Sequence, residues 1–234
     1  MALIGVEKRT IFPVLLFFTL SISLSLPPIT ALENLEDVLV AEFWTELDPM
    51  VGEGSSRPLS QEEAIRRCLE EARLVLSGMI YGYEVRYTPS DRSRQIEELI
   101  EIEPRESIPR GDPALRVMNT RMVDNRYYIR VRYNLKEYQI HRRQAWATNT
   151  YQSAGGRGNV SLQEGYRGKF RSFEEAIKNA LRAYLQARER NKPREISAQV
   201  AYQEPPYTRI DAGGYHSKVR IKLKIKELQP YSAY

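Results

Sequence analysis

Apolar residues recur at helical spacing in two separate segments of the chain, and the same short motif opens both. Ser60 is followed by Gln-Glu-Glu-Ala-Ile, and Ser172 is followed by Phe-Glu-Glu-Ala-Ile. A serine followed three residues later by glutamate is the capping-box signature of a helix start. The apolar positions that follow fall on one helical face and predict two amphipathic helices. They are Ala64, Ile65, Cys68, Leu69, Ala72 and Leu76 in the first segment, and Ala176, Ile177, Ala180, Leu181, Tyr184 and Leu185 in the second.

Segments of alternating polarity follow each helix and predict strands. After the first helix they are residues 83–87 and a hairpin of 116–123 with 126–135, turned by Asp124-Asn125, which tolerate positive φ. After the second helix they are residues 196–202 and a hairpin of 208–210 with 215–227. The two long final strands also align, with Ile129 matching Val219, and both end in Lys-Glu. This self-similarity indicates an internal repeat.

The expected fold is therefore α+β, with two repeated helix–strand–strand–strand units. Each unit would be an antiparallel sheet with one helix packed on it. The first unit spans residues 60–137 and the second 172–234. An insert at 90–113, acidic and proline-bearing, is interpreted as a solvated excursion with a short helix over 95–102; the alternative is a binding loop. Residues 138–171 form a Gly/Arg/aromatic connector, of which 144–152 could extend the first sheet and the glycine-rich part is expected to be mobile.

The N-terminus has the layout of a secretory signal peptide over residues 1–31. Lys8 and Arg9 precede an uncharged apolar run, and two prolines and the small residue Ala31 follow it. The pattern predicts cleavage after Ala31. The alternative is an uncleaved anchor, which a short run interrupted by Pro13 disfavours, because a span needs about 20 apolar residues. Residues 32–59 are an N-terminal segment, with a candidate helix at 35–43.

Cysteine content and charge narrow the location and the partners. Cys68 is the chain's one cysteine, so no internal disulfide can form, and an exported chain of this kind suits a bacterial periplasm. Its place on an apolar helix face favours a small buried hydrophobe over a reactive thiol. The formal net charge of +5 is mildly basic and does not by itself indicate nucleic acid, which export makes improbable.

The sequence offers no catalytic, cofactor or metal constellation. His141 and His216 have no ligand-spaced partners, and the first-turn glutamate pairs are explained by the helix dipole. Residues 155–158, Gly-Gly-Arg-Gly, follow no predicted strand and open no helix, so they fail the context test for a phosphate loop. We therefore expect no enzyme, no cofactor and no metal; an enzyme of unrecognised type remains an alternative.

The final strand carries the strongest functional signal. Side chains alternate faces along a strand, so Lys218, Arg220, Lys222, Lys224 and Lys226 point the same way. The matching positions of the first unit are Tyr128, Arg130, Arg132, Asn134 and Lys136. A basic sheet face would bind an anionic partner. The structural alternative is that lysines protect an exposed strand from aggregation or that neighbouring strands supply acids.

The candidate binding residues are cations and aromatics of these strands and of the connector. Arginine and tyrosine in loops suit protein or glycan contacts. The full set is Arg130, Arg132, Lys136, Arg142, Arg143, Trp146, Tyr151, Arg157, Tyr166, Arg167, Lys218, Arg220, Lys222 and Lys224.

The helix-to-strand pattern over residues 62–69 and 174–181 resembles the small α+β modules of bacterial envelope and flagellar accessory proteins; no residue role is carried over from it. The leading hypothesis is a non-enzymatic periplasmic or secreted protein that acts as a protein-binding or assembly module. Two similar surfaces could engage one assembly with raised effective concentration. The alternative is a binding module for an anionic lipid headgroup or envelope polymer, and strong salt dependence would favour it.

Overall fold

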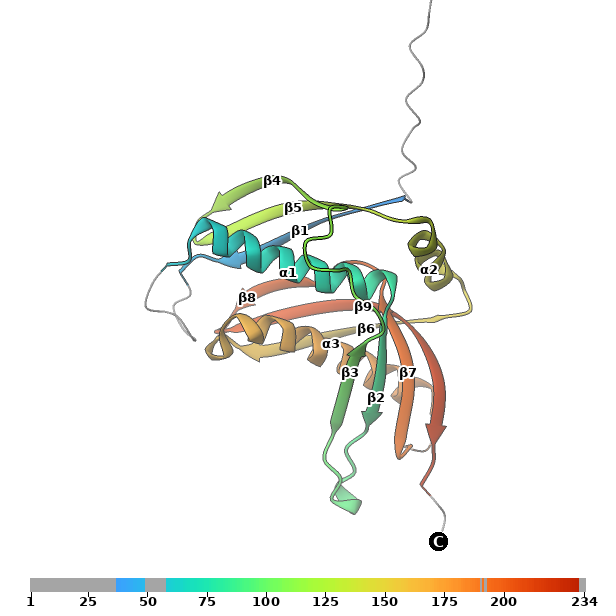
Figure 1. Ribbon diagram of the computed structural model, residues 1–234. Coiled ribbons are helices and arrows are strands. Elements are labelled where there is room, and N and C mark those ends of the chain that lie inside the picture. Colours follow the sequence, from blue (N-terminus) through green and yellow to red (C-terminus); the bar gives the residue numbers. More distant parts are fainter. Residues whose placement is uncertain (1–36, 49–57, 190, 192, 232–234) are drawn as a thin grey trace, which may run out of the picture. The chain divides into compact units, whose positions relative to one another are not determined.

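The computed structural model describes residues 37–48, 58–189, 191 and 193–231. The expected signal peptide and its cleavage site lie outside these residues. Within them, no helix is long and apolar enough to cross a membrane. The elements, in chain order, are β1 (Val38–Glu46), α1 (Gln61–Ile80), β2 (Tyr83–Thr88), the 3-10 helix η2 (Arg92–Arg94), β3 (Leu99–Pro104), β4 (Leu115–Val123), β5 (Arg126–Asn134), α2 (Glu137–Ala147), β6 (Gln152–Ser161), the 3-10 helix η3 (Leu162–Glu164), α3 (Gly165–Arg188), β7 (Glu195–Tyr202), β8 (Tyr207–Asp211) and β9 (Gly214–Gln229) (Figure 1).

The fold is α+β with two antiparallel sheets, as predicted. The three-stranded sheet has the order β1-β5-β4, and the six-stranded sheet has the order β3-β2-β7-β9-β6, with β8 also paired to β9. Helix α1 lies along the three-stranded sheet, and α3 lies along β6 and β9 (Figure 1). The long helices therefore lie on different sheets, and α1 also contacts β7 of the six-stranded sheet, so that all of these elements share one core.

Helix α1 begins where the sequence predicts. Ser60 is its N-cap and accepts a hydrogen bond from the Glu63 amide. Ala64, Cys68 and Ala72 on its apolar face are fully buried. Burial raises the pKa of the Cys68 thiol to about 12, which keeps it protonated and agrees with an inert core residue.

Helix α3 begins eight residues earlier than predicted, and Ser172 does not cap it. The helix starts at Gly165, so Ser172 is fully buried in its interior. The Ser172 hydroxyl donates to the Lys169 carbonyl at 2.6 Å and lies 2.5 Å from the Ser217 hydroxyl on β9. The motif looked like a helix start, but the preceding residues already have helical hydrogen bonds, so no free amide remains there for the serine to cap.

Both predicted hairpins are confirmed. Asp124 turns β4 into β5 with a φ of 51°, and Ala212 and Gly213 turn β8 into β9 with φ values of 45° and 76°. The predicted strands after each helix are also confirmed as β2 and β7.

Two predicted helices are strands instead. The described part of the candidate helix at 35–43 enters β1 at Val38, and Leu39, Ala41 and Phe43 alternate inward and are buried. Residues 99–102 of the second segment lie in β3, which pairs with β2 as an edge strand. Burial alternates along both strands, so the inward residues recur every second position and the helical period was wrong.

The glycine-rich segment is a regular strand and the closest contact of α3. A Cβ on Gly156 would lie 2.0 Å from the Ala176 carbonyl oxygen, and one on Gly158 would lie 2.0 Å from the Ser172 carbonyl oxygen. The glycines let the helix backbone approach β6 directly. The prediction that the glycine-rich segment is mobile is therefore wrong. Residues 144–152 were a candidate extension of the first sheet, but α2 (Glu137–Ala147) includes the first four of them, and Gln152 begins β6.

The two predicted units do not each form a separate sheet. Strand β2 follows α1 but pairs with β7, so it belongs to the six-stranded sheet. Residues Glu84 and Gln199, which face each other across this pairing, are joined by a 2.6 Å hydrogen bond. The two halves of the chain therefore share one sheet.

Candidate functional site

Strand β9 alternates as the sequence predicts. Val219, Ile221 and Leu223 are buried on the face of the six-stranded sheet that carries α3, here called its inner face. The outer face of the same strand carries Lys218, Arg220, Lys222 and Lys224. Lys222 is half-buried, and the other three are exposed.

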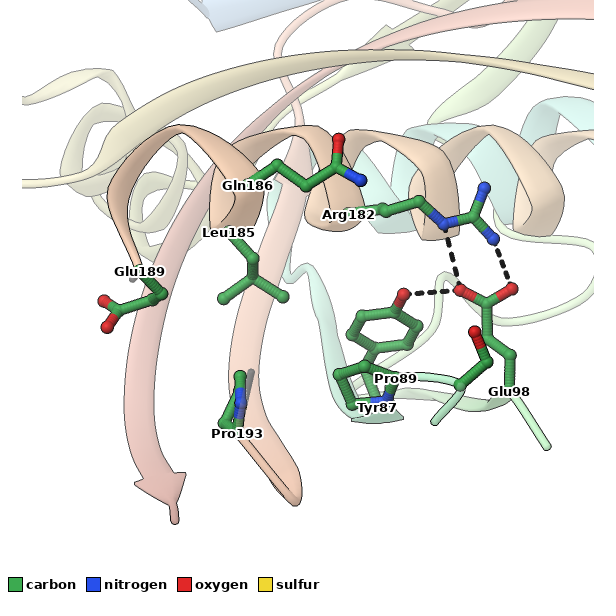
Figure 2. A pocket seen from close by; sticks show the side chains of 9 residues that line it. Tyr87, Pro89, Glu98, Arg182, Leu185, Gln186, Glu189 and Pro193 are labelled. Carbon is green, nitrogen blue, oxygen red and sulfur yellow. Dashed lines mark hydrogen bonds and ion pairs between the residues drawn. The ribbon is translucent and has the colours of Figure 1, made fainter. Parts of the chain in front are cut away.

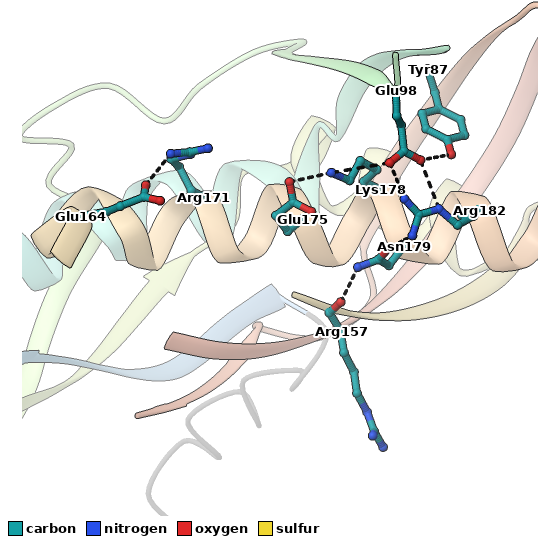
Figure 3. Close-up of polar contacts among 9 residues, drawn as sticks. All are labelled: Tyr87, Glu98, Arg157, Glu164, Arg171, Glu175, Lys178, Asn179 and Arg182. Carbon is teal, nitrogen blue, oxygen red and sulfur yellow. Dashed lines mark hydrogen bonds and ion pairs between the residues drawn. The ribbon is translucent and has the colours of Figure 1, made fainter. Parts of the chain in front are cut away.

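Arg157 on β6 extends this row of cations across the sheet. It pairs directly with Lys218 in the strand register, so two like charges are cross-strand neighbours. Figure 3 shows its side chain pointing away from α3, while its backbone carbonyl accepts a hydrogen bond from Asn179 at 2.8 Å. We call Arg157, Lys218, Arg220, Lys222 and Lys224 the basic face.

Acidic side chains scarcely neutralise the basic face. Within the part of the chain that the structure describes, Arg157, Lys218 and Lys224 form no ion pair. Arg220 and Glu204 approach only to 3.9 Å with both side chains exposed, and such a contact contributes little. The cross-strand partners of Lys222 are Ser153 and Ala201, which are uncharged. Lys226, farther along β9, is different because it forms an ion pair with Glu84 at 2.9 Å.

The matching row on the three-stranded sheet is partly neutralised. Arg130 faces Glu42 across the β1–β5 register, and the carboxylate of Glu42 forms an ion pair with Arg121 on β4 at 2.7 Å. Arg132 donates to the Asn134 side chain at 2.9 Å. Lys136 has left the strand and is the N-cap of α2. The structural alternative, acids supplied by neighbouring strands, therefore applies in part to the three-stranded sheet, where Glu42 is the strand neighbour of Arg130. Among the described residues, no acid is the strand neighbour of a cation of the basic face.

A pocket of about 370 Å³ lies between α2 and the outer face, next to the basic face. We call it the α2 pocket. It brings together three of the predicted binding residues, Arg143, Trp146 and Lys222. A fourth, Tyr151, packs its ring 4.8 Å from that of Trp146, and its carbonyl accepts a hydrogen bond from Lys222 at 3.3 Å. Residues from the connector and from the last strand thus converge although the sequence separates them.

Two features fix α2 beside the sheet. Gln139 is buried at 1% exposure and donates to the hydroxyls of Tyr81 and Tyr133 at 2.7 and 2.9 Å. Gly82 has a φ of +75°, and a Cβ there would lie 2.8 Å from the indole of Trp146 and 3.4 Å from Ala201. Trp146 therefore covers Ala201 on the outer face, and only glycine allows this approach at position 82.

Three further candidates lie away from this site. Arg142 pairs with Glu106 at 2.7 Å. Tyr166, expected in a loop, lies in the first turn of α3, and its hydroxyl donates to the Arg67 carbonyl at 2.6 Å. Burial raises the pKa of Tyr166 strongly, so it connects α3 to α1 as a neutral phenol. Arg167 is exposed beside it.

A second pocket, of about 320 Å³, was not anticipated from the sequence (Figure 2). Its polar wall is Glu98, which accepts a hydrogen bond from the Tyr87 hydroxyl at 2.5 Å and a two-pronged contact from Arg182. Figure 3 shows Lys178 between Glu175 and Glu98, 2.6 and 3.9 Å from their carboxylates. Burial acts to raise the pKa of Glu98, but the bonds from Tyr87 and Arg182 outweigh it and lower the pKa.

The contacts of Glu98 connect β2, through Tyr87, and the segment before β3 to α3, through Arg182 and Lys178. Arg182 and Tyr87 both bind Glu98, so these three side chains form a connected wall of the pocket. Its other polar lining residues are Ser90, Gln186 and Glu189. No sequence signal could have found it, since Glu98 and Arg182 are far apart in the chain and their contact depends on β2 crossing to the six-stranded sheet. In the described residues, no group of three side chains is placed to hold a metal ion.

Comparisons with known proteins place the chain among relatives. A protein-family model of a domain of unknown function matches residues 26–231. An uncharacterized protein of Treponema pallidum (strain Nichols) is 26% identical over 194 residues, which cover 82% of this chain and 81% of the relative. No solved structure matches the chain.

Proposed function

We propose that the chain, which belongs to the family whose model spans all of its described residues, is an exported, non-catalytic binding protein that holds a negatively charged partner on its basic face. One observation carries the proposal: five cations share one sheet face, and among the described residues no acid is their strand neighbour, whereas Glu42 is the strand neighbour of Arg130 on the other sheet. Like charges placed as cross-strand neighbours are destabilising. A partner that supplies the anions would relieve this repulsion.

Charge on a sheet face also suits an extended partner. Lys218, Arg220, Lys222 and Lys224 recur about every 6.6 Å along β9. A polymer with regularly spaced carboxylates or phosphates could contact several of them at once. Each exposed contact is weak, so affinity would come from their number and would be screened by salt.

The proposed location rests on the N-terminal sequence. Lys8, Arg9, the apolar run and Ala31 support export by a cleaved signal peptide, and the mature protein would be periplasmic or secreted. The mass of the protein purified from cells tests this: a chain that begins at Leu32 supports cleavage, and a full-length chain held in the membrane fraction contradicts it.

We also propose that the chain arose by duplication of a unit that starts one strand earlier than its helix. The pairings support this. Phe43 on β1 faces Ile129, Gly156 on β6 faces Val219, and Ile129 and Val219 are the positions that the sequence repeat aligns. Each unit would then run strand, helix, then further strands, with its first strand paired to its last.

A protein partner is the second candidate function, and the open edge of β4 favours it. Strand β4 is at the end of the three-stranded sheet, and its Val117, Met118 and Met122 are 38%, 53% and 66% exposed. Apolar side chains on an unpaired edge are unusual in a protein that stays alone. A partner strand could add to this edge and bury them.

Cross-linking of the tagged protein in intact cells, followed by washes at low and high salt, separates the two candidates. The basic face predicts an anionic polymer or lipid that is released by salt. A discrete protein that resists high salt would contradict the basic face as the principal site and support the β4 edge.

A further inference from the structure

We propose that the α2 pocket binds one sugar unit of an acidic saccharide chain, whose remaining charged units lie along the basic face. This inference rests on the proposed function and names the chemical class of its partner. The pocket and the basic face share Lys222, so a chain leaving the pocket meets Arg220 or Lys224 next on the same strand.

The pocket has the size and polarity for a single ring. Its volume of about 370 Å³ lies within the range of small-molecule sites. Apolar surface comes from Met79, Ile140 and Trp146, and the polar groups come from the opposing elements α2 and β7–β9. A sugar presents an apolar face of C–H bonds and a rim of hydroxyls, which matches such a divided lining.

The polar groups favour a sugar over a lipid tail or a simple anion. Gln144 and Gln203 flank the pocket, and an amide both donates and accepts hydrogen bonds, as a hydroxyl does. Lys222 and Arg143 add positive charge from opposite sides, which suits a carboxylate or phosphate on the ring. The Lys222 ammonium is held by the carbonyls of Thr148 and Tyr151 at 3.4 and 3.3 Å, so its position is set before a ligand arrives.

The walls are preorganised by contacts outside the pocket. Trp146 is 7% exposed, packs against the Tyr151 ring at an interplanar angle of 41° and contacts the backbone at Gly82. Gln139 holds the other end of α2 through the two tyrosine hydroxyls. A rigid site loses little freedom when it binds, which favours selectivity for one ring shape over non-specific attraction of any polyanion.

The chain's two tryptophans permit a direct test. A Trp44→Phe variant leaves Trp146 as the remaining tryptophan, so its fluorescence reports on the pocket. The probes are an oligogalacturonate, which has a carboxylate on each sugar, and poly-glutamate, which has carboxylates and no sugar. We expect oligogalacturonate to change the Trp146 emission and to bind at least about five-fold more tightly than poly-glutamate at equal carboxylate concentration.

A pocket variant and a matched control distinguish the contribution of the pocket to binding from that of the charged surface. Gln144→Ala with Gln203→Ala should reduce the preference for the saccharide to about unity and leave poly-glutamate binding unchanged. Gln163→Ala with Gln186→Ala, at exposed positions elsewhere, should preserve the preference. Equal binding of both polymers with no change in Trp146 emission would overturn the pocket inference and leave the proposed function standing. Failure of both polymers to bind would overturn the proposed function itself.

Discussion

The ammonium of Lys169 lies 2.7 Å from the carboxylate of Glu71, and both side chains are almost fully buried, at 2% and 5% exposure. The contact joins α3 to α1. Lys169 also donates to the Trp44 carbonyl at 2.7 Å and lies 4.0 Å from the centre of the Trp44 ring. One lysine therefore connects both long helices to β1, and with them the two sheets.

Removing one partner of this pair should be strongly destabilising. Lys169→Met leaves the Glu71 carboxylate buried without its cation, and burial already raises the pKa of Glu71. We expect a loss of about 3–5 kcal/mol in the free energy of unfolding, measured by urea denaturation at pH 7. The double variant Lys169→Met, Glu71→Met should recover most of this loss. A single variant as stable as the wild type would show that the pair is not buried as described.

The buried pair also shows where sequence reasoning ends. Lys169 lay in a segment interpreted as a connector, and nothing in its neighbours signals that a lysine is in the core. Its burial follows from the early start of α3 and from the packing of α1 beside it, which are both tertiary features. Local periodicity predicted α1, β2 and β7 because each of these segments buries one face, and the residues of the turns helped to predict both hairpins. It failed for β6, whose glycines have no apolar pattern.

The packing of α3 on β6 depends on two glycines. Gly156→Ala would place a Cβ 2.0 Å from the backbone oxygen of Ala176, so the helix must move. We expect a loss of about 1–3 kcal/mol or more in the free energy of unfolding. The matched control is Gly155→Ala, whose Cβ would point outward with its nearest atom 3.7 Å away. That change should leave stability unchanged or raise it by less than about 1 kcal/mol. Equal effects of the two changes would contradict the placement of β6.

The Glu98 cluster predicts a pH dependence of stability. Hydrogen bonds from Tyr87 and Arg182 outweigh burial and lower the pKa of Glu98 below its ordinary 4.5 in the folded chain. Its contribution is therefore fully present above pH 4.5 and is lost as the pH falls through the folded pKa. Glu98→Gln should cost about 1–2 kcal/mol at pH 7 and flatten the acid side of the stability profile. Glu97→Gln, at an exposed neighbour, is the control; an identical profile for the two variants would exclude the cluster as the cause.

Alternation along one strand predicted the basic face, and the pairing of the strands showed which charges are neighbours of its cations. The sequence showed equivalent cationic rows on both final strands. Only the register revealed that Arg130 faces Glu42 whereas Lys218 faces Arg157. Which strands become neighbours is a long-range property, so the sequence could not decide between the structural and functional interpretations of these rows.

The central claim is tested most directly by measuring the affinity of the mature protein for poly-glutamate at about 50 and 300 mM salt. The test variant is Lys218→Ser, Arg220→Ser, Lys224→Ser, and the control with the same change in net charge is Arg92→Ser, Arg116→Ser, Arg130→Ser. Both should retain wild-type stability within about 0.5 kcal/mol, since the substituted residues are exposed. We predict that wild type and control bind at low salt and weaken sharply at high salt, and that the test variant binds at least about ten-fold more weakly at low salt. Equal affinity of the two variants would contradict the basic face as the binding site.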